Sequence, residues 1–141
     1  MFEIRKATLK EIDIILKMAL KLDISSTREK IKKATEEGHL FVAVSDNTFL
    51  GYILIEFLDQ NHHLFPNSIF INDLFVEEDF RNKGVGKSLV NFVLNQKYPP
   101  KYRYFSITHS PKKPWLSHYY ESFGFKENGV TEAGNVKMIL R

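Results

Sequence analysis

The chain has 141 residues, of which 43% are hydrophobic and 13% aromatic, and this composition suits a single domain with one packed core. Twenty Lys and Arg face 17 Asp and Glu, for a formal net charge of +3. This small excess is scattered along the chain and does not favour a nucleic acid as partner. Cysteine is absent, which excludes disulfides, thiolate metal sites and cysteine nucleophiles.

A secretory leader has an apolar stretch after a basic segment, and the first residues of this chain, MFEIRKATL, do not show this pattern. No window reaches the roughly 18 apolar residues of a membrane span. We therefore expect a soluble cytoplasmic protein without a membrane partner, folded as a single domain over residues 1–141.

The N-terminal region predicts a strand followed by two helices. Residues 2–5 alternate apolar and polar side chains, as a half-buried strand does. Thr8 and Glu11 have the spacing of a capping box and predict the start of an amphipathic helix. Ser26 and Glu29 have the same spacing and predict a second, more polar helix.

The middle of the chain is rich in β-forming residues. Two runs, residues 39–44 and 49–58, are separated by the turn signal Ser-Asp-Asn-Thr at 45–48 and predict a hairpin. Residues 60–67 read as a loop. Residues 68–76 form a strand that is apolar on both faces, which indicates a central position in a sheet.

After residue 76, helices alternate with strands as far as residue 122. A helix is predicted over residues 84–97, a strand over 102–107 and a helix over 114–122. Two short strands, at 126–130 and 136–140, end the chain. The predicted order is β-α-α-β-β-β-α-β-α-β-β, which places the chain in the α+β class.

The turn before the 84–97 helix, with the sequence RNKGVGKS at 81–88, resembles phosphate-binding loops. A Walker loop requires glycine at position 81, where this chain has Arg81. A dinucleotide-binding fingerprint requires a third glycine where the chain has Leu89. The pattern that fits is Arg81-x-x-Gly84-x-Gly86 between a strand and a helix, in which backbone N–H groups and the helix dipole hold a pyrophosphate without metal. The alternative is a tight turn without a ligand.

Two segments carry a resemblance to a known family. The segment IFINDLFVEEDFRNKGVGKSLVNFVL, at residues 69–94, resembles the acetyl-CoA-binding motif of the GCN5-related N-acetyltransferase (GNAT) superfamily. YYESFGF, at 119–125, is similar to the end of a helix of that family. Both occur in the family's order, and the resemblance covers essentially the whole chain. It implies a mixed, mostly antiparallel sheet of about seven strands with about four helices. The residues that carry the first match are Leu74, Val76, Arg81, Gly84, Gly86 and Leu89.

The resemblance also implies a cosubstrate, acetyl-CoA, and the residues that hold it. The pantetheine would bond the backbone of the strand that ends at Val76, and the pyrophosphate would lie on N–H groups of residues 81–87. The implied cofactor-binding residues are Leu74, Phe75, Val76, Arg81, Asn82, Lys83, Gly84, Val85, Gly86 and Lys87.

Four side chains are candidates for catalysis, one of them weaker than the other three. Tyr120 occupies the family position of the acid that protonates the departing CoA sulfur; its alternative role is packing, although Tyr119 is expected to be the core residue of the two. Asp73 and Glu56 are candidate bases for the amine, directly or through water, and the alternative for each is a salt bridge or an exposed strand end. His109, expected in a loop, is a weaker candidate.

Two functions follow. The first is an N-acetyltransferase that acts on a primary amine of a small molecule or peptide, with a homodimer expected from the resemblance. The second is a catalytically inactive acyl-CoA-binding module that acts as a sensor or partner protein. It is motivated by Lys113 and Leu116, which stand where the family often has Asn and Ala. No metal is expected, because His62 and His63 are adjacent and lack further ligands.

Overall fold

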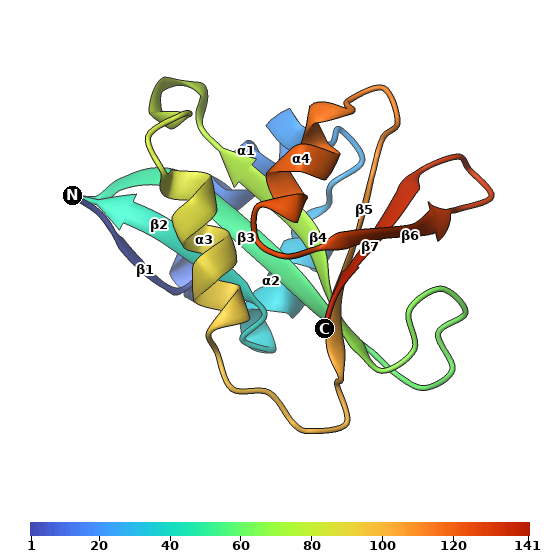
Figure 1. Ribbon diagram of the computed structural model, residues 1–141. Helices are drawn as coiled ribbons and strands as arrows, with labels where there is room; N and C mark the ends of the chain where they lie inside the picture. The colour runs from blue at the N-terminus through green and yellow to red at the C-terminus, as the bar shows by residue number, and fades with distance from the viewer. The chain divides into compact units, whose positions relative to one another are not determined.

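The computed structural model describes residues 1–141 and confirms the predicted order of helices and strands (Figure 1). The strands belong to a seven-stranded sheet with the order β1-β2-β3-β4-β5-β7-β6. The pair β4–β5 is parallel, and β1–β2, β2–β3, β5–β7 and β6–β7 are antiparallel. The α+β class is therefore confirmed.

The elements are β1 (Glu3–Lys6), η1 (Leu9–Glu11), α1 (Ile12–Leu22), α2 (Arg28–Glu36), β2 (Leu40–Ser45), β3 (Thr48–Leu58), β4 (Ser68–Val76), η2 (Glu78–Phe80), α3 (Val85–Leu94), β5 (Tyr104–His109), α4 (Trp115–Glu121), β6 (Lys126–Val130) and β7 (Val136–Leu140).

The chain divides into two compact units, each described by itself. The first contains residues 1–55 and 72–96, and the second contains residues 56–71 and 97–141. The long strands β3 and β4 contribute residues to both. The single domain predicted over residues 1–141 stays a prediction. None of the helices has the length and hydrophobicity that a membrane crossing requires.

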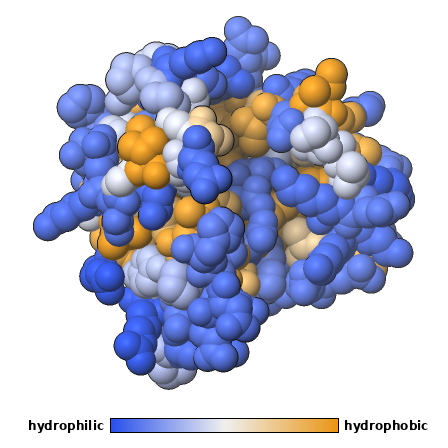
Figure 2. Space-filling model, turned by 90° about the vertical axis from the view of Figure 1, so that its right-hand side faces the viewer, coloured by the Kyte–Doolittle hydropathy of each residue, from blue (hydrophilic) through white to orange (hydrophobic).

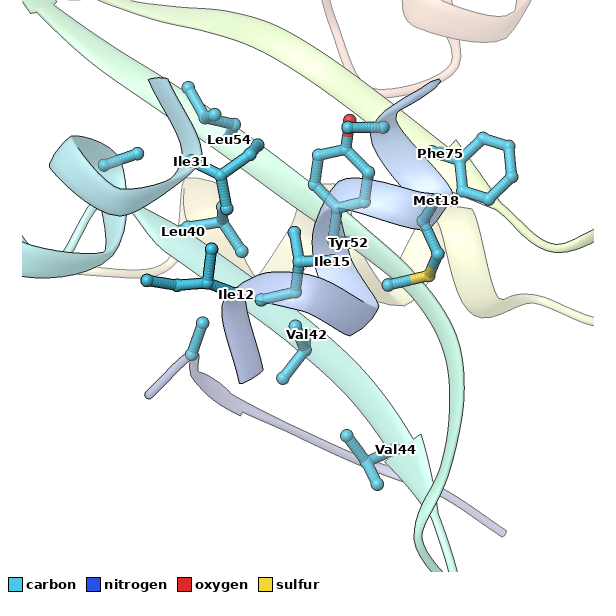
Figure 3. Close-up of a cluster of buried hydrophobic side chains, with 13 residues drawn as sticks. Ile12, Ile15, Met18, Ile31, Leu40, Val42, Val44, Tyr52, Leu54 and Phe75 are labelled. Carbon is cyan, nitrogen blue, oxygen red and sulfur yellow. The ribbon is translucent and has the colours of Figure 1, made fainter. Parts of the chain in front are cut away.

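The core of the first unit follows from the alternation of side chains along β2. Leu40 and Val42 point to one side and pack in a cluster with residues of α1 and α2, including Ile15 (Figure 3). Phe41 points to the other side, where its ring lies 5.2 Å from that of Phe92 on α3. Helices therefore cover both faces of this part of the sheet, as the period-two pattern requires.

The first predicted helix cap is confirmed and the second is displaced by one residue. The Thr8 N–H donates to Glu11 Oε1 at 2.9 Å within a complete capping box. At the second site the N-cap is Thr27, whose hydroxyl accepts from the Lys30 N–H at 3.2 Å. The Ser26 hydroxyl instead donates to the backbone oxygen of Ala19, a contact that the local sequence does not reveal.

The predicted end of α3 is also wrong. The helix ends at Leu94, three residues before the predicted end at residue 97, and Gln96 is exposed. The side-chain amides of Asn95 and Gln96 donate to the carbonyls of Asn91 and Phe92, at 2.8 and 3.2 Å. These bonds satisfy acceptors that a helix end leaves without partners.

The second unit contains an antiparallel arrangement of β5, β7 and β6 next to the start of β4. β4 and β5 are joined in parallel through three residue pairs, the first being Ser68 with Tyr104, and the hydroxyls of Ser68 and Ser106 lie 2.9 Å apart. β5 begins two residues later than predicted and includes His109, which was expected in the following loop. Three aromatic rings, those of Phe57, Tyr98 and Tyr102, pack near its start.

Candidate active site

The predicted phosphate-binding turn joins β4 to α3 in the first unit. Asn82 and Gly84 both have positive φ, 63° and 85°. A Cβ added to Gly84 would meet no atom within 4 Å. Glycine is therefore favoured at position 84 by its left-handed backbone rather than by lack of space. Asn is one of the few other residues that adopt this conformation readily, which explains its place at 82.

The start of α3 presents backbone donors. Gly84 is its N-cap, and the bond from the Ser88 N–H to the Gly84 carbonyl is 3.0 Å long. The N–H groups of the preceding residues have no partner within the helix, and the helix dipole makes this end positive. Val85 is buried and anchors the helix, whereas Lys87 is exposed beside the free donors. The arrangement suits a phosphate group.

Arg81 has a role that the sequence did not reveal. Its Nε donates to the Val76 carbonyl at 2.8 Å, and its guanidinium carbon lies 5.7 Å from the centre of the Phe75 ring. Its backbone N–H donates to the Glu78 carbonyl at 3.3 Å. Arg81 thus ties the turn to the end of β4, and the donors that remain for a pyrophosphate begin after residue 81.

Gly51 on β3 lies against the end of β4, a contact that neither sequence motif indicates. A Cβ at this position would lie 2.3 Å from the Phe75 carbonyl oxygen and 3.1 Å from the Val76 Cα. Close by, the Glu77 N–H donates to the Leu50 carbonyl at 2.7 Å. Gly51 therefore permits a close approach of backbones at the end of β4, where the cofactor strand was predicted. Its signal in the sequence is a glycine inside a β-rich run.

Asp73, a candidate base, is buried on β4 in the first unit, with 7% of its surface exposed. The Tyr52 hydroxyl donates to its Oδ2 at 2.9 Å. The Lys30 ammonium lies 3.3 and 3.4 Å from its two carboxylate oxygens. Burial, followed by the negative charge of Asp73, raises the pKa of Tyr52, so this phenol stays protonated and can donate. The salt bridge foreseen as an alternative for Asp73 is present, and its role as base stays a prediction.

Tyr120, the candidate acid, lies on α4 in the second unit. Its ring packs at 5.2 Å from that of Tyr119 and 5.7 Å from that of Phe125. Burial raises the pKa of Tyr120, which keeps the phenol protonated at neutral pH. Of the two tyrosines Tyr120 is the more buried and Tyr119 is only partly buried, the reverse of the expected order.

Glu56, the other candidate base, is exposed on β3 in the second unit. It lines a cavity of about 630 Å³. The ring of His62 stacks against those of His63 and Phe65 along this cavity, at 5.3 and 6.5 Å. The other lining residues are Leu58, Leu64, Phe70, Thr108, Val130, Thr131, Glu132, Ala133 and Asn135.

His109 is buried in the second unit and belongs to a polar cluster that reaches the exposed Glu127. Its Nε2 lies 2.8 Å from the Ser117 hydroxyl, which donates to Glu127 Oε2 at 2.7 Å. Its Nδ1 lies 3.0 Å from the Ser110 carbonyl. Both ring nitrogens therefore have partners within the chain.

The structure thus brings together, within the first unit, the ten predicted cofactor-binding residues and Asp73. Residues 36–127, which include both motifs, match the family model of the acetyltransferase (GNAT) domain. The chain belongs to the GNAT family. This membership confirms the resemblance and identifies the chain as an acetyltransferase.

Solved structures of GNAT proteins have the same fold. A GNAT-family acetyltransferase from Bacillus cereus is 20% identical, with a TM-score of 0.78 over 99% of this chain and 94% of that one. Diaminobutyrate acetyltransferase EctA from Paenibacillus lautus, solved with L-2,4-diaminobutyric acid and coenzyme A, is 16% identical, with a TM-score of 0.74 over 99% and 93%. PaiA N-acetyltransferase from Thermoplasma acidophilum, solved with coenzyme A, is 15% identical, with a TM-score of 0.69 over 100% and 99%. No curated protein matches the sequence significantly.

Proposed function

We propose that the chain transfers the acetyl group of acetyl-CoA to a primary amine of a small molecule or peptide by direct attack. The observation that carries this proposal is the turn from β4 into α3, where Gly84 starts a helix whose first N–H groups are available to a pyrophosphate. It lies within the part of the chain that matches the acetyltransferase model. The coenzyme A in two neighbouring structures supports acetyl-CoA as donor.

In the proposed complex the backbone of Leu74, Phe75 and Val76 bonds the pantetheine as an added strand would. The pyrophosphate accepts hydrogen bonds from N–H groups of residues 82–87. Lys87 adds positive charge beside them. Because the contacts are mostly made by backbone, the turn requires glycines while most of its other side chains are free to vary.

The proposed reaction has four steps. The neutral amine attacks the thioester carbon, and a backbone N–H of the strand 74–76 stabilises the oxyanion. The amine loses its proton to Asp73 or Glu56, directly or through water. The carbon–sulfur bond then breaks, and Tyr120 gives its proton to the sulfur and regains one from solvent. The products are an acetamide and CoA with a free thiol.

The test measures thiol release from acetyl-CoA with a panel of polyamines, amino acids, aminoglycosides and peptides. We expect turnover with at least one amine, and a fall in kcat of about 10²- to 10⁴-fold in Tyr120→Phe. Tyr119→Phe is the matched control, since it removes the neighbouring hydroxyl. Equal kcat in Tyr120→Phe and the wild type would show that Tyr120 is not the acid.

The second candidate function, an inactive acyl-CoA-binding module, is favoured by Lys113 and Leu116 at the family's Asn and Ala positions. Both functions require that acetyl-CoA stabilises the fold, by about 2.7 kcal/mol at 100 times its Kd. Stabilisation without turnover on the whole panel would favour the module. The cytoplasmic location and the homodimer stay predictions.

A further inference from the structure

Lys30 and Tyr52, from separate parts of the first unit, both contact the carboxylate of Asp73. Lys30 comes from α2, Tyr52 from β3, and Asp73 from β4. The Lys30 Nζ lies 3.3 Å from Oδ1 and 3.4 Å from Oδ2, and the Tyr52 hydroxyl lies 2.9 Å from Oδ2. The structure therefore shows a primary alkylammonium, that of a lysine, bound to a buried carboxylate.

The carboxylate requires a cation at this place. The Asp73 side chain is 8% exposed, and a buried charge without a partner is strongly unfavourable. The phenol of Tyr52 supplies one neutral hydrogen bond and no charge. If the lysine leaves, the site will favour another cation that can donate hydrogen bonds.

Lys30 can be displaced more easily than Asp73 or Tyr52 can move. Its side chain is 34% exposed, and both contacts to Asp73 are longer than the 2.7–2.9 Å typical of a strong charge-assisted bond. A lysine also loses considerable side-chain freedom when it is held in one position. Tyr52 is fully buried in the cluster with Ile15 and Phe75 (Figure 3).

The position of the carboxylate gives the pair its functional meaning. Asp73 directly precedes Leu74, the first of the three residues proposed to hold the pantetheine. Consecutive residues of a strand rise by about 3.3 Å. The bound ammonium therefore lies beside the segment where the acetyl group would be delivered.

We propose that Asp73 and Tyr52 form the binding site for the primary ammonium of the acceptor, that Lys30 occupies this site in its absence, and that the acceptor displaces Lys30. The inference rests on the proposed function and extends it to a substrate class: unbranched primary alkylamines such as a lysine side chain or a diamine. Such amines present the same three N–H donors as Lys30, whereas a quaternary ammonium presents none. Lys30 thereby acts as an internal competitor that sets acceptor affinity.

The test is a binding experiment that requires neither acetyl-CoA nor turnover. Isotope-labelled protein is titrated with n-butylammonium chloride, and the amide resonances of residues 71–75 are followed by NMR. Tetramethylammonium chloride controls for charge and ionic strength. We expect n-butylammonium to bind Lys30→Met roughly tenfold more tightly than the wild type, because a charge-assisted competitor is gone. Lys32→Met, on the exposed side of the same helix, should bind as the wild type does.

Two further variants complete the experiment. Lys30→Gln retains a polar side chain and should also bind more tightly, which keeps the test valid if Lys30→Met folds poorly. Asp73→Asn should lose the response. The proposal is overturned if neither Lys30 variant gains affinity, or if tetramethylammonium produces the same shifts. Failure of acetyl transfer with intact n-butylammonium binding would instead count against the proposed function alone.

Discussion

The two units contain polar clusters of different construction. In the first unit, the long and partly exposed side chain of Lys30 contacts the two carboxylate oxygens of Asp73 at 3.3 and 3.4 Å. In the second unit, Ser117 lies between His109 and Glu127 at 2.8 and 2.7 Å, through a short side chain that is buried on α4. The cation of the first cluster can leave, whereas the central hydroxyl of the second is fixed by its helix. This difference is why we propose a ligand site in the first cluster and expect a structural network in the second.

The largest effect is expected from Asp73→Asn. The amide cannot accept a proton from the amine or attract its charge, so kcat/KM for the acceptor should fall by about 10²- to 10⁴-fold. Steady-state kinetics at saturating acetyl-CoA measures this. Stabilisation by acetyl-CoA should be unchanged, because the cofactor is proposed to bind backbone atoms. A variant with full activity would remove the distinction between the two clusters.

A smaller effect, on stability rather than activity, is expected from Ser117→Ala. The change leaves the buried Nε2 of His109 without its partner, whereas the exposed Glu127 can bond water. An unsatisfied buried polar group costs about 1–3 kcal/mol. Denaturant unfolding should show this loss, with kcat/KM close to that of the wild type. Lost activity at unchanged stability would show that the second cluster takes part in the reaction.

The smallest effect is expected at the ion pair of Arg5 and Glu11. This pair is partly exposed, so its contribution to stability can be compared with those of the two clusters. The hydrogen bonds from Arg5 and Thr8 and the charge of Arg5 lower the pKa of Glu11 below its usual value of 4.5. A lowered pKa means that the stabilisation is complete above the unfolded-state pKa and is lost as the pH falls through the folded-state pKa. Glu11→Gln should therefore destabilise by about 0.5 kcal/mol at pH 7 and have little effect in strong acid. Unfolding curves at several pH values test this, and a pH-independent difference would contradict it.

The sequence predicted well what depends on local signals. The bounds of β4, β6 and β7 match the prediction, and so does the capping box of Thr8 and Glu11. The left-handed residues Asp46 and Asn47 occupy the predicted hairpin turn. Turn chemistry and hydrophobic alternation act over a few residues and are visible in one sequence.

What the sequence missed depends on contacts between distant residues. The cap at Thr27 was missed because Ser26 is engaged by Ala19. The pairing of Lys30 with Asp73 joins residues 43 positions apart, and nothing in the local pattern marks it. The greater burial of Tyr120 than Tyr119 depends on the rings around it, since adjacent helix positions differ only in direction.

The surface on the side shown in Figure 2 is mostly hydrophilic, and hydrophobic residues occur there in separate small areas. Several large apolar side chains are nevertheless exposed, among them Trp115 and Val130. The homodimer stays a prediction. Its test is the mass in solution, with and without acetyl-CoA.

Gly51 and Gly84 have different consequences for the tolerance of the chain to substitution. At position 84 a saturation mutagenesis library should retain asparagine and aspartate, because these adopt the left-handed backbone and would find open space. At position 51 even alanine should be depleted, because the obstacle is a backbone oxygen 2.3 Å away. A residue outside both motifs, Gly51, would then tolerate fewer substitutions among active variants than Gly84, a glycine within the first motif.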